Sequence, residues 1–157
     1  MFENNEFGYA EIMKEIGKQK EKAYKILELI ADAIHAESGI FWIYMKNTDE
    51  KIHPIASFGN INTNNCALRL NEGILGKTIL KKDGEIIADC KNDPRWVNNK
   101  IKYIDYDFKT VVFVPMQYDN YSLCIEMNNK TNNDVYNEDD YEIIKNITDK
   151  IIKLLNN

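Results

Sequence analysis

The stretch "EGILGKTILKKDGEIIADCKNDPRW", from Glu72 to Trp96, decides the fold of this chain. Its first part predicts a short helix, because four side chains share one stripe at helical spacing: Ile74, Leu75, Thr78 and Ile79. Asp83-Gly84 is a strong turn signal, residues 85–89 read as a short strand, and Pro94 favours an irregular loop. No evident acid, base or metal set accompanies these elements, so the stretch indicates architecture rather than catalysis.

Long amphipathic segments stand at both ends of the chain. From Tyr9 to about Ala36 the apolar residues recur in steps of three, four and seven, which predicts one face of a helix that ends at Ser38-Gly39. Gly17 is a weak point in this helix, where a break into two helices is an alternative. A second helix is expected after Asn137, a good N-cap followed by acidic residues, and it runs to about residue 155.

Strands are predicted between these helices and joined by tight turns, which gives an antiparallel sheet. They cover residues 40–45, 52–58, 68–71, 85–89, 110–116 and 121–129. Pro54 lacks a backbone donor, so the 52–58 strand is placed at a sheet edge. The expected class is α+β: a central antiparallel sheet of five to six strands, with the N- and C-terminal helices on one face and loops and short helices on the other.

Composition excludes several classes of function. The 157 residues fit one domain, 1–157, and a net charge of −5 without a basic stripe argues against nucleic acid as a partner. The longest apolar runs are too short to cross a membrane and the N-terminus does not resemble a signal peptide, so a cytoplasmic protein is expected. The cysteines (Cys66, Cys90 and Cys124) and two histidines lack metal-ligand spacing, so no metal site is predicted.

The central stretch resembles the middle of GAF domains. In that family a Glu-Gly-Ile-x-Gly turn and a short helix lead to a Gly-Glu and an apolar strand, and Asp-Pro-Arg with an aromatic residue follows, as at Asp93 to Trp96. "FKTVVFVPM" resembles the family's strand that ends in Val-Pro-Leu. The resemblance covers a core of about 21–155, which leaves 1–20 as an N-terminal helical extension.

The C-terminal part resembles a motif of cyclic-nucleotide-binding GAF domains. Asn129, Lys130 and Asp140 match it, whereas Tyr136 replaces a Phe and Tyr141 replaces a Glu. The resemblance implies that Lys130 and Asp140 pair and brace the fold without touching a ligand. The missing acid argues against cyclic nucleotides.

A ligand pocket is expected between the sheet and its roof of loops, 59–68 and 90–109. Its predicted lining is Phe58, Leu68, Ile74, Leu75, Trp96 and Phe113, with Trp96 as a lid. The sequence predicts no catalytic residue and identifies no cofactor. The resulting hypothesis is a sensory or regulatory domain that binds an unidentified small molecule and signals through its terminal helices, as a homodimer or to a separate signalling protein.

Two other functions stay open. Free methionine-(R)-sulfoxide reductases are single GAF domains that work through cysteines, but one of their cysteines lies within the Gly-Ile-x-Gly turn, where this chain has Leu75. Cys66 precedes the turn as one of theirs does. Cys90 precedes the Asp-Pro corner, and no cysteine follows later in that loop, where their nucleophile would lie. The other alternative is a ligandless dimerisation scaffold.

Overall fold

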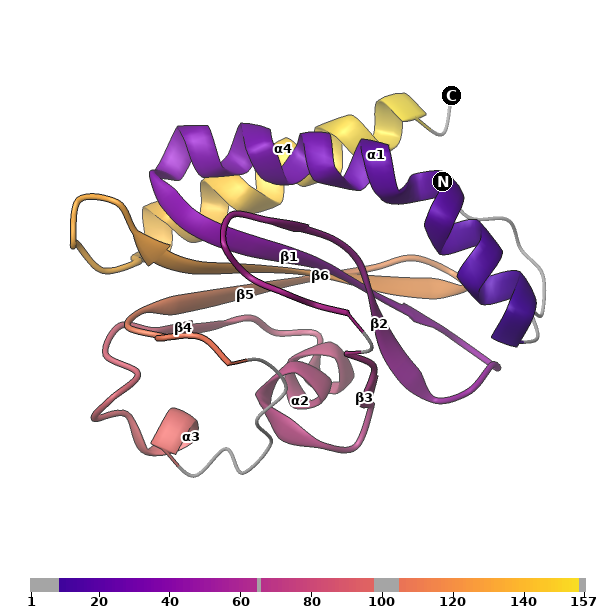
Figure 1. The fold of residues 1–157 in the computed structure, drawn as a ribbon, viewed down its shortest axis with the longest axis horizontal. Coiled ribbons are helices and arrows are strands. Elements are labelled where there is room, and N and C mark those ends of the chain that lie inside the picture. The colour runs from indigo at the N-terminus through magenta and orange to yellow at the C-terminus, as the bar shows by residue number, and fades with distance from the viewer. Residues whose placement is uncertain (1–8, 65, 98–104, 156–157) are drawn as a thin grey trace.

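The computed structural model describes residues 9–64, 66–97 and 105–155, which form one six-stranded antiparallel sheet between two layers (Figure 1). The elements in chain order are α1 (Tyr9–Ile34), β1 (Ala36–Met45), β2 (Lys51–Phe58), β3 (Leu68–Arg69), α2 (Gly73–Lys81), β4 (Glu85–Ile87), α3 (Pro94–Val97), β5 (Val111–Gln117), β6 (Tyr121–Lys130) and α4 (Glu138–Leu155). The strand order is β3-β2-β1-β6-β5-β4. The predicted α+β class is confirmed.

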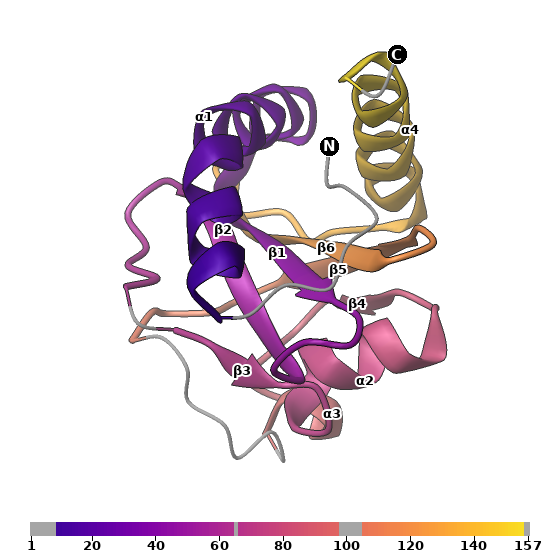
Figure 2. The same cartoon turned by 90° about the vertical axis from the view of Figure 1, so that its right-hand side faces the viewer.

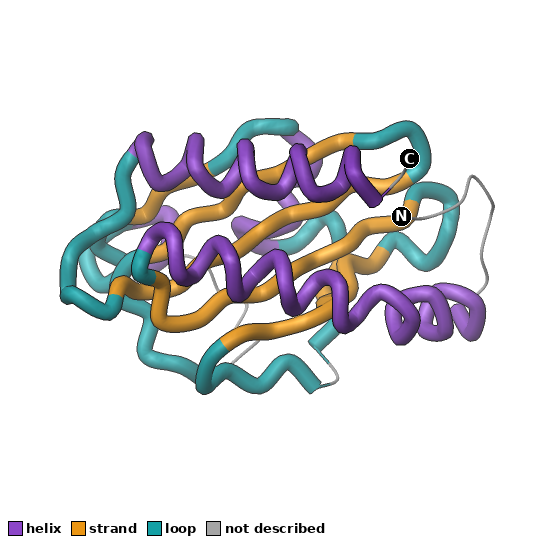
Figure 3. The backbone as a smooth tube through the Cα atoms, turned by 90° about the horizontal axis from the view of Figure 1, so that it is seen from above, coloured by secondary structure: helices purple, strands orange, loops and turns teal. Residues whose placement is uncertain are grey.

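The terminal helices α1 and α4 lie side by side on one face of the sheet, which we call the helix face (Figures 2 and 3). The other face carries α2, α3 and the loops around them, and we call it the lid face. Each face has its own buried cluster, since side chains alternate along a strand. On β1, Phe41 and Ile43 belong to the helix-face cluster, whereas Ile40 and Trp42 belong to the lid-face cluster.

The first helix ends earlier than its sequence pattern predicts. It stops at Ile34, and His35 turns the chain with a φ of 59°. Ser38 and Gly39 therefore do not end a helix but lie within β1, opposite Asn128 and Met127 of β6. Pairing with β6 begins at Ala36, and these added backbone hydrogen bonds outweigh the helical pattern of the sequence.

The prediction that β2 is an edge strand is wrong, because β3 lies outside it. The reason given for that prediction still applies at Pro54. A two-residue strand, β3, lies outside β2 and pairs only with Lys51 and Ile52. Pro54 lies beyond this pairing, where the outer side of β2 has no neighbouring strand among the described residues. The missing proline donor is therefore tolerated.

Two glycines of the central stretch lie where a side chain would be strained or would clash. Gly73 opens α2 with a φ of 72°, a conformation that costs glycine little. Gly76 faces the turn that follows β3, and a Cβ atom there would lie 2.1 Å from the carbonyl oxygen of Leu70. The glycines therefore let α2 pack closely against the segment that precedes it.

The C-terminal brace predicted from the motif is present. Lys130 at the end of β6 donates to both carboxylate oxygens of Asp140 in α4, at 3.2 and 3.0 Å. Asn137 caps α4 as predicted: the Asp140 amide donates to Asn137 Oδ1 and the Asn137 amide donates to Asp140 Oδ2. The Tyr136 hydroxyl donates to the Asn129 carbonyl from a buried position. Together these contacts fix the end of β6 to the start of α4.

Candidate functional site

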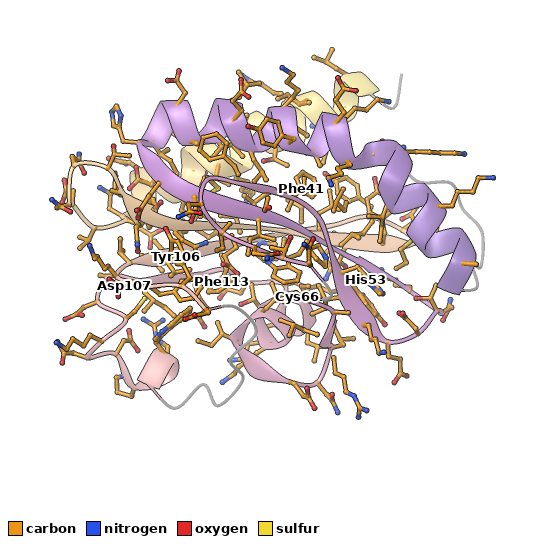
Figure 4. The ribbon with its side chains drawn as sticks, in the orientation of Figure 1. Phe41, His53, Cys66, Tyr106, Asp107 and Phe113 are labelled. Atoms are coloured by element: carbon orange, nitrogen blue, oxygen red, sulfur yellow. The ribbon has the colours of Figure 1, made fainter. Side chains whose placement is uncertain are left out.

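Five of the six predicted pocket residues lie on the lid face. Ile74 and Leu75 of α2 and Phe113 of β5 are buried in the lid-face cluster, with 9%, 2% and 1% of their surfaces exposed. Leu68 of β3 and Trp96 of α3 are partly buried against the same cluster. In Figure 4 the labelled Phe113 and Cys66 lie on the lid side of the sheet and Phe41 lies on the helix side.

Phe58 is the exception, and its predicted role in the pocket is wrong. It packs against the helix-face cluster, with its ring 6.0 Å from that of Tyr24 on α1. The cause is a register shift between Phe41 and Trp42: Trp42 pairs with Pro54, but Phe41 pairs with Ala56. One extra residue in β2 reverses the alternation of side chains, so Ala56 and Phe58 face the helices although Ile52 faces the lid.

Aromatic rings and one arginine organise the roof of the lid face. Trp96 packs against Phe108, and Tyr106 packs against the same ring, each with ring centroids 4.9 Å apart. Arg95 holds α3 to β4 by donating to the Glu85 carboxylate and to the Ile86 carbonyl. The predicted roof loop 90–109 also includes residues 98–104, which lie outside the described residues.

The floor beneath this roof carries buried polar groups that the sequence analysis missed. Glu126 and Asn128 on β6 are both 0% exposed and follow Cys124 at alternate positions of one strand face. Trp42 Nε1 donates to Glu126 Oε1 at 3.2 Å. Burying a carboxylate among apolar side chains is costly, so such a residue is more often functional than incidental. The signal in the sequence was a charged residue, Glu126, between the apolar Ile125 and Met127 in a predicted strand.

The three cysteines lie in the lid-face cluster as buried free thiols. Burial, together with the negative charge of Glu126, raises the pKa of Cys66 to about 11. Burial, the neighbouring aspartates and Glu126 raise the pKa of Cys90 to about 12, and the pKa of Cys124 is also well above its usual value. Thiols in this state are protonated at neutral pH and react slowly, because the thiolate is the nucleophile.

The hollows that described residues line include a larger and a smaller one. The larger, of about 1400 Å³, lies along the outer edge of β2 between the first half of α1 and the loop that includes Cys66. The smaller, of about 570 Å³, lies where the lid-face loops meet the ends of β1 and β6, and Asn129 and Lys130 are among its lining residues. The five predicted lid-face residues line neither of these two, so their role in binding stays a prediction.

Metal-binding and membrane-spanning features are both missing from the described part of the chain. There, no group of three or more His, Cys, Asp and Glu side chains is placed to hold a metal ion. None of the helices in the described ranges has the length and apolar character needed to span a bilayer.

Solved structures with this architecture include GAF domains and a related enzyme, whereas no family model and no curated protein matches the chain. A type II free methionine-R-sulfoxide reductase from Thermoplasma acidophilum superimposes with a TM-score of 0.68 at 15% identity, over 88% of this chain and 93% of its own. The GAF domain of an Acinetobacter phosphoenolpyruvate-protein phosphotransferase gives 0.66 at 15%, over 92% and 90%. The GAF domain/HD domain protein of Geobacter sulfurreducens gives 0.63 at 12%, over 87% and 91%. The chain therefore has a GAF-domain fold.

Proposed function

We propose that the chain is a regulatory domain that binds a small molecule on the lid face of its sheet. The observation that carries the proposal is Glu126, a carboxylate with 0% of its surface exposed, set in an apolar floor and held by Trp42 Nε1 at 3.2 Å. A few polar groups in an apolar, roofed surface are typical of small-molecule sites. The remaining lining would come from Leu68, Ile74, Leu75, Trp96 and Phe113.

The architecture offers a route from this site to the terminal helices. Glu126 faces the lid, whereas its neighbours Ile125 and Met127 on β6 pack in the helix-face cluster beneath α1 and α4. A ligand that favours one position of β6 would thus also favour one packing of the helices. We propose that the helices pass this change to a second copy of the chain or to a separate signalling protein, in the cytoplasm.

The test is native mass spectrometry and thermal unfolding of gently purified protein in the presence of cell metabolite extracts. We expect the wild type to retain or bind a ligand and Glu126→Gln to lose it, because the substituted amide can still accept from Trp42 but lacks the charge. Glu28→Gln is the matched control, since Glu28 is exposed on α1 on the far side of the sheet. Equal binding by wild type and Glu126→Gln would contradict the proposal.

Reduction of free methionine sulfoxide is the second candidate, supported by the similarity to the Thermoplasma enzyme. The chemistry needs a thiolate that attacks the sulfoxide sulfur and a second thiol that resolves the oxidised cysteine. The raised pKa values of Cys66 and Cys90 weigh against it. An NADPH-coupled assay of sulfoxide reduction distinguishes the two functions. Turnover by the wild type that disappears in the double variant Cys66→Ser, Cys90→Ser would establish the reductase. Absence of turnover in the wild type would leave the regulatory function as the proposal. A domain that binds no metabolite yet dimerises would instead be the scaffold.

A further inference from the structure

Asn128 is buried on the lid face, and no described residue hydrogen-bonds to its side-chain amide group. It lies on the same strand face as Cys124 and Glu126, because the pairing of β6 with both neighbouring strands runs through residues 123–128 without a register shift. Its cross-strand neighbours are Ser38 on β1 and Val111 on β5. Within the described structure, neither Nδ2 nor Oδ1 of Asn128 makes a hydrogen bond, and the residue is 0% exposed.

Other buried polar residues show how this protein ordinarily satisfies such groups. The next residue, Asn129, accepts at Oδ1 from the amides of Lys109 and Thr110 and donates from Nδ2 to the Asp107 carbonyl. The buried Thr78 hydroxyl donates to the Ile74 carbonyl at 2.8 Å. A buried amide that lacks both a donor and an acceptor partner is costly, and in native proteins it calls for a specific explanation.

We propose that Asn128 recognises an amide-type group of the ligand, namely an N–H donor beside a carbonyl acceptor as in carboxamides, lactams and cyclic ureides. The inference rests on the proposed function, since it names the ligand class of the same site. An asparagine side chain presents one acceptor and two donors in a plane, and its complement is a planar group that offers the reverse pair. The buried Ser38 hydroxyl, opposite Asn128 on β1, adds a third polar group at this position.

Glu126 limits the charge of this ligand. It lies two residues from Asn128 along the same face, roughly 7 Å away. A carboxylate or phosphate held by Asn128 would therefore lie near a buried carboxylate in a surrounding of low polarity, where like charges repel strongly. The site is thus expected to take a neutral or cationic amide and to reject the corresponding acid.

The experiment uses the full chain and pairs of probes that differ only in amide and acid: nicotinamide with nicotinate and benzamide with benzoate, with hydantoin as a cyclic ureide. Binding is followed at millimolar concentrations by thermal unfolding and by ligand-observed NMR. We expect saturable binding of at least one amide or ureide, at least tenfold weaker binding of its acid partner, and loss of binding in Asn128→Leu. Leucine has a similar size and removes only the hydrogen-bonding groups.

Stability separates this result from misfolding. Because no residue in the described ranges hydrogen-bonds to the Asn128 amide, Asn128→Leu should keep or raise the unfolding temperature of the ligand-free protein. The control Asn129→Leu should lower it, because this change removes three hydrogen bonds and places leucine at a φ of 56°.

Equal binding of amides and acids, retained binding in Asn128→Leu, or no binding across the probe panel would each overturn the inference. A ligand from cell extract that still depends on Glu126 would, in any of these cases, leave the proposed function standing.

Discussion

Lys130 Nζ lies 3.0 Å from Asp140 Oδ2, and these side chains are only 8% and 9% exposed. The pair joins the last residue of β6 to the first turn of α4. Asp140 has a second task there, because it also accepts from the Asn137 amide. A contact between two distant parts of the chain is thus combined with a helix cap.

Lys130→Met should destabilise the protein by about 3–5 kcal/mol, because it leaves the Asp140 carboxylate buried without its cation. Urea unfolding followed by circular dichroism measures the effect. Lys153→Met is the control, since Lys153 pairs with Asp149 on the surface, where the two side chains are 73% and 45% exposed. That change should stay within about 0.5 kcal/mol, and comparable losses in the two variants would contradict a bracing role for Lys130.

Two glycine-to-alanine changes should have opposite signs. Gly76→Ala places a methyl group against the Leu70 carbonyl oxygen and should cost about 1–3 kcal/mol, because α2 or the preceding segment must shift. Gly17→Ala meets no atom within 4 Å in the middle of α1 and should stabilise by up to about 1 kcal/mol. Chemical denaturation of both variants checks the pair. A neutral Gly76→Ala would show that the close packing of α2 is not required.

The two faces of the sheet differ in how far the sequence predicts them. Helical periodicity gave α2 and α4, and the Gly-Ile-x-Gly resemblance placed α2, Ile74 and Leu75 above the sheet. The placement of Phe58 on the lid face was wrong because of the extra residue in β2. That residue follows from how β2 pairs with β1, and the sequence of one strand does not show this pairing. Asn128 was missed for a related reason: "CIEMNN" shows polar residues, but the sequence does not show which of them becomes buried. In the described part of the chain, both faces of the sheet are covered and the Asn128 amide is left without a hydrogen-bond partner.

The thiols provide a prediction about pH. The pKa of Cys66 is raised to about 11 and that of Cys90 to about 12 in the folded protein, against 9.0 for an ordinary thiol. The folded state therefore holds these protons more tightly than the unfolded state, so the stability that the thiols contribute is present below about pH 9 and falls as the pH rises from there toward 11. We expect the free energy of unfolding, measured from pH 8 to pH 11, to fall as the pH rises. The fall should be less steep in Cys66→Ala than in the wild type, because the variant lacks this thiol.

Alkylation of the same thiols with iodoacetamide at neutral pH should be slow in the native protein and fast in urea. Intact mass spectrometry over time measures the number of modified cysteines. Cys66 should react first, because it is 8% exposed and lines the large hollow beside β2, whereas Cys90 and Cys124 are 1% and 0% exposed. A rapidly modified thiol at pH 7 would overturn this expectation and favour the reductase.

Trp96 should report on the roof of the site. The chain has two tryptophans, and Trp42 is wholly buried beside Glu126, so Trp42→Phe leaves Trp96 as the single reporter. Trp96 is partly exposed and packs on Phe108, and ligand binding beneath the roof should lower the quenching of its fluorescence by acrylamide. Because Trp42→Phe also removes the hydrogen bond to Glu126, the test needs a binding measurement of this variant first.

Phe58→Ala serves as the control for the opposite face: it should lower stability, since Phe58 packs with Tyr24, but leave the ligand-induced protection of Trp96 unchanged. Loss of that protection in Phe58→Ala would mean that the two faces are not separate sites, and the binding site would then have to include the helix side of β2.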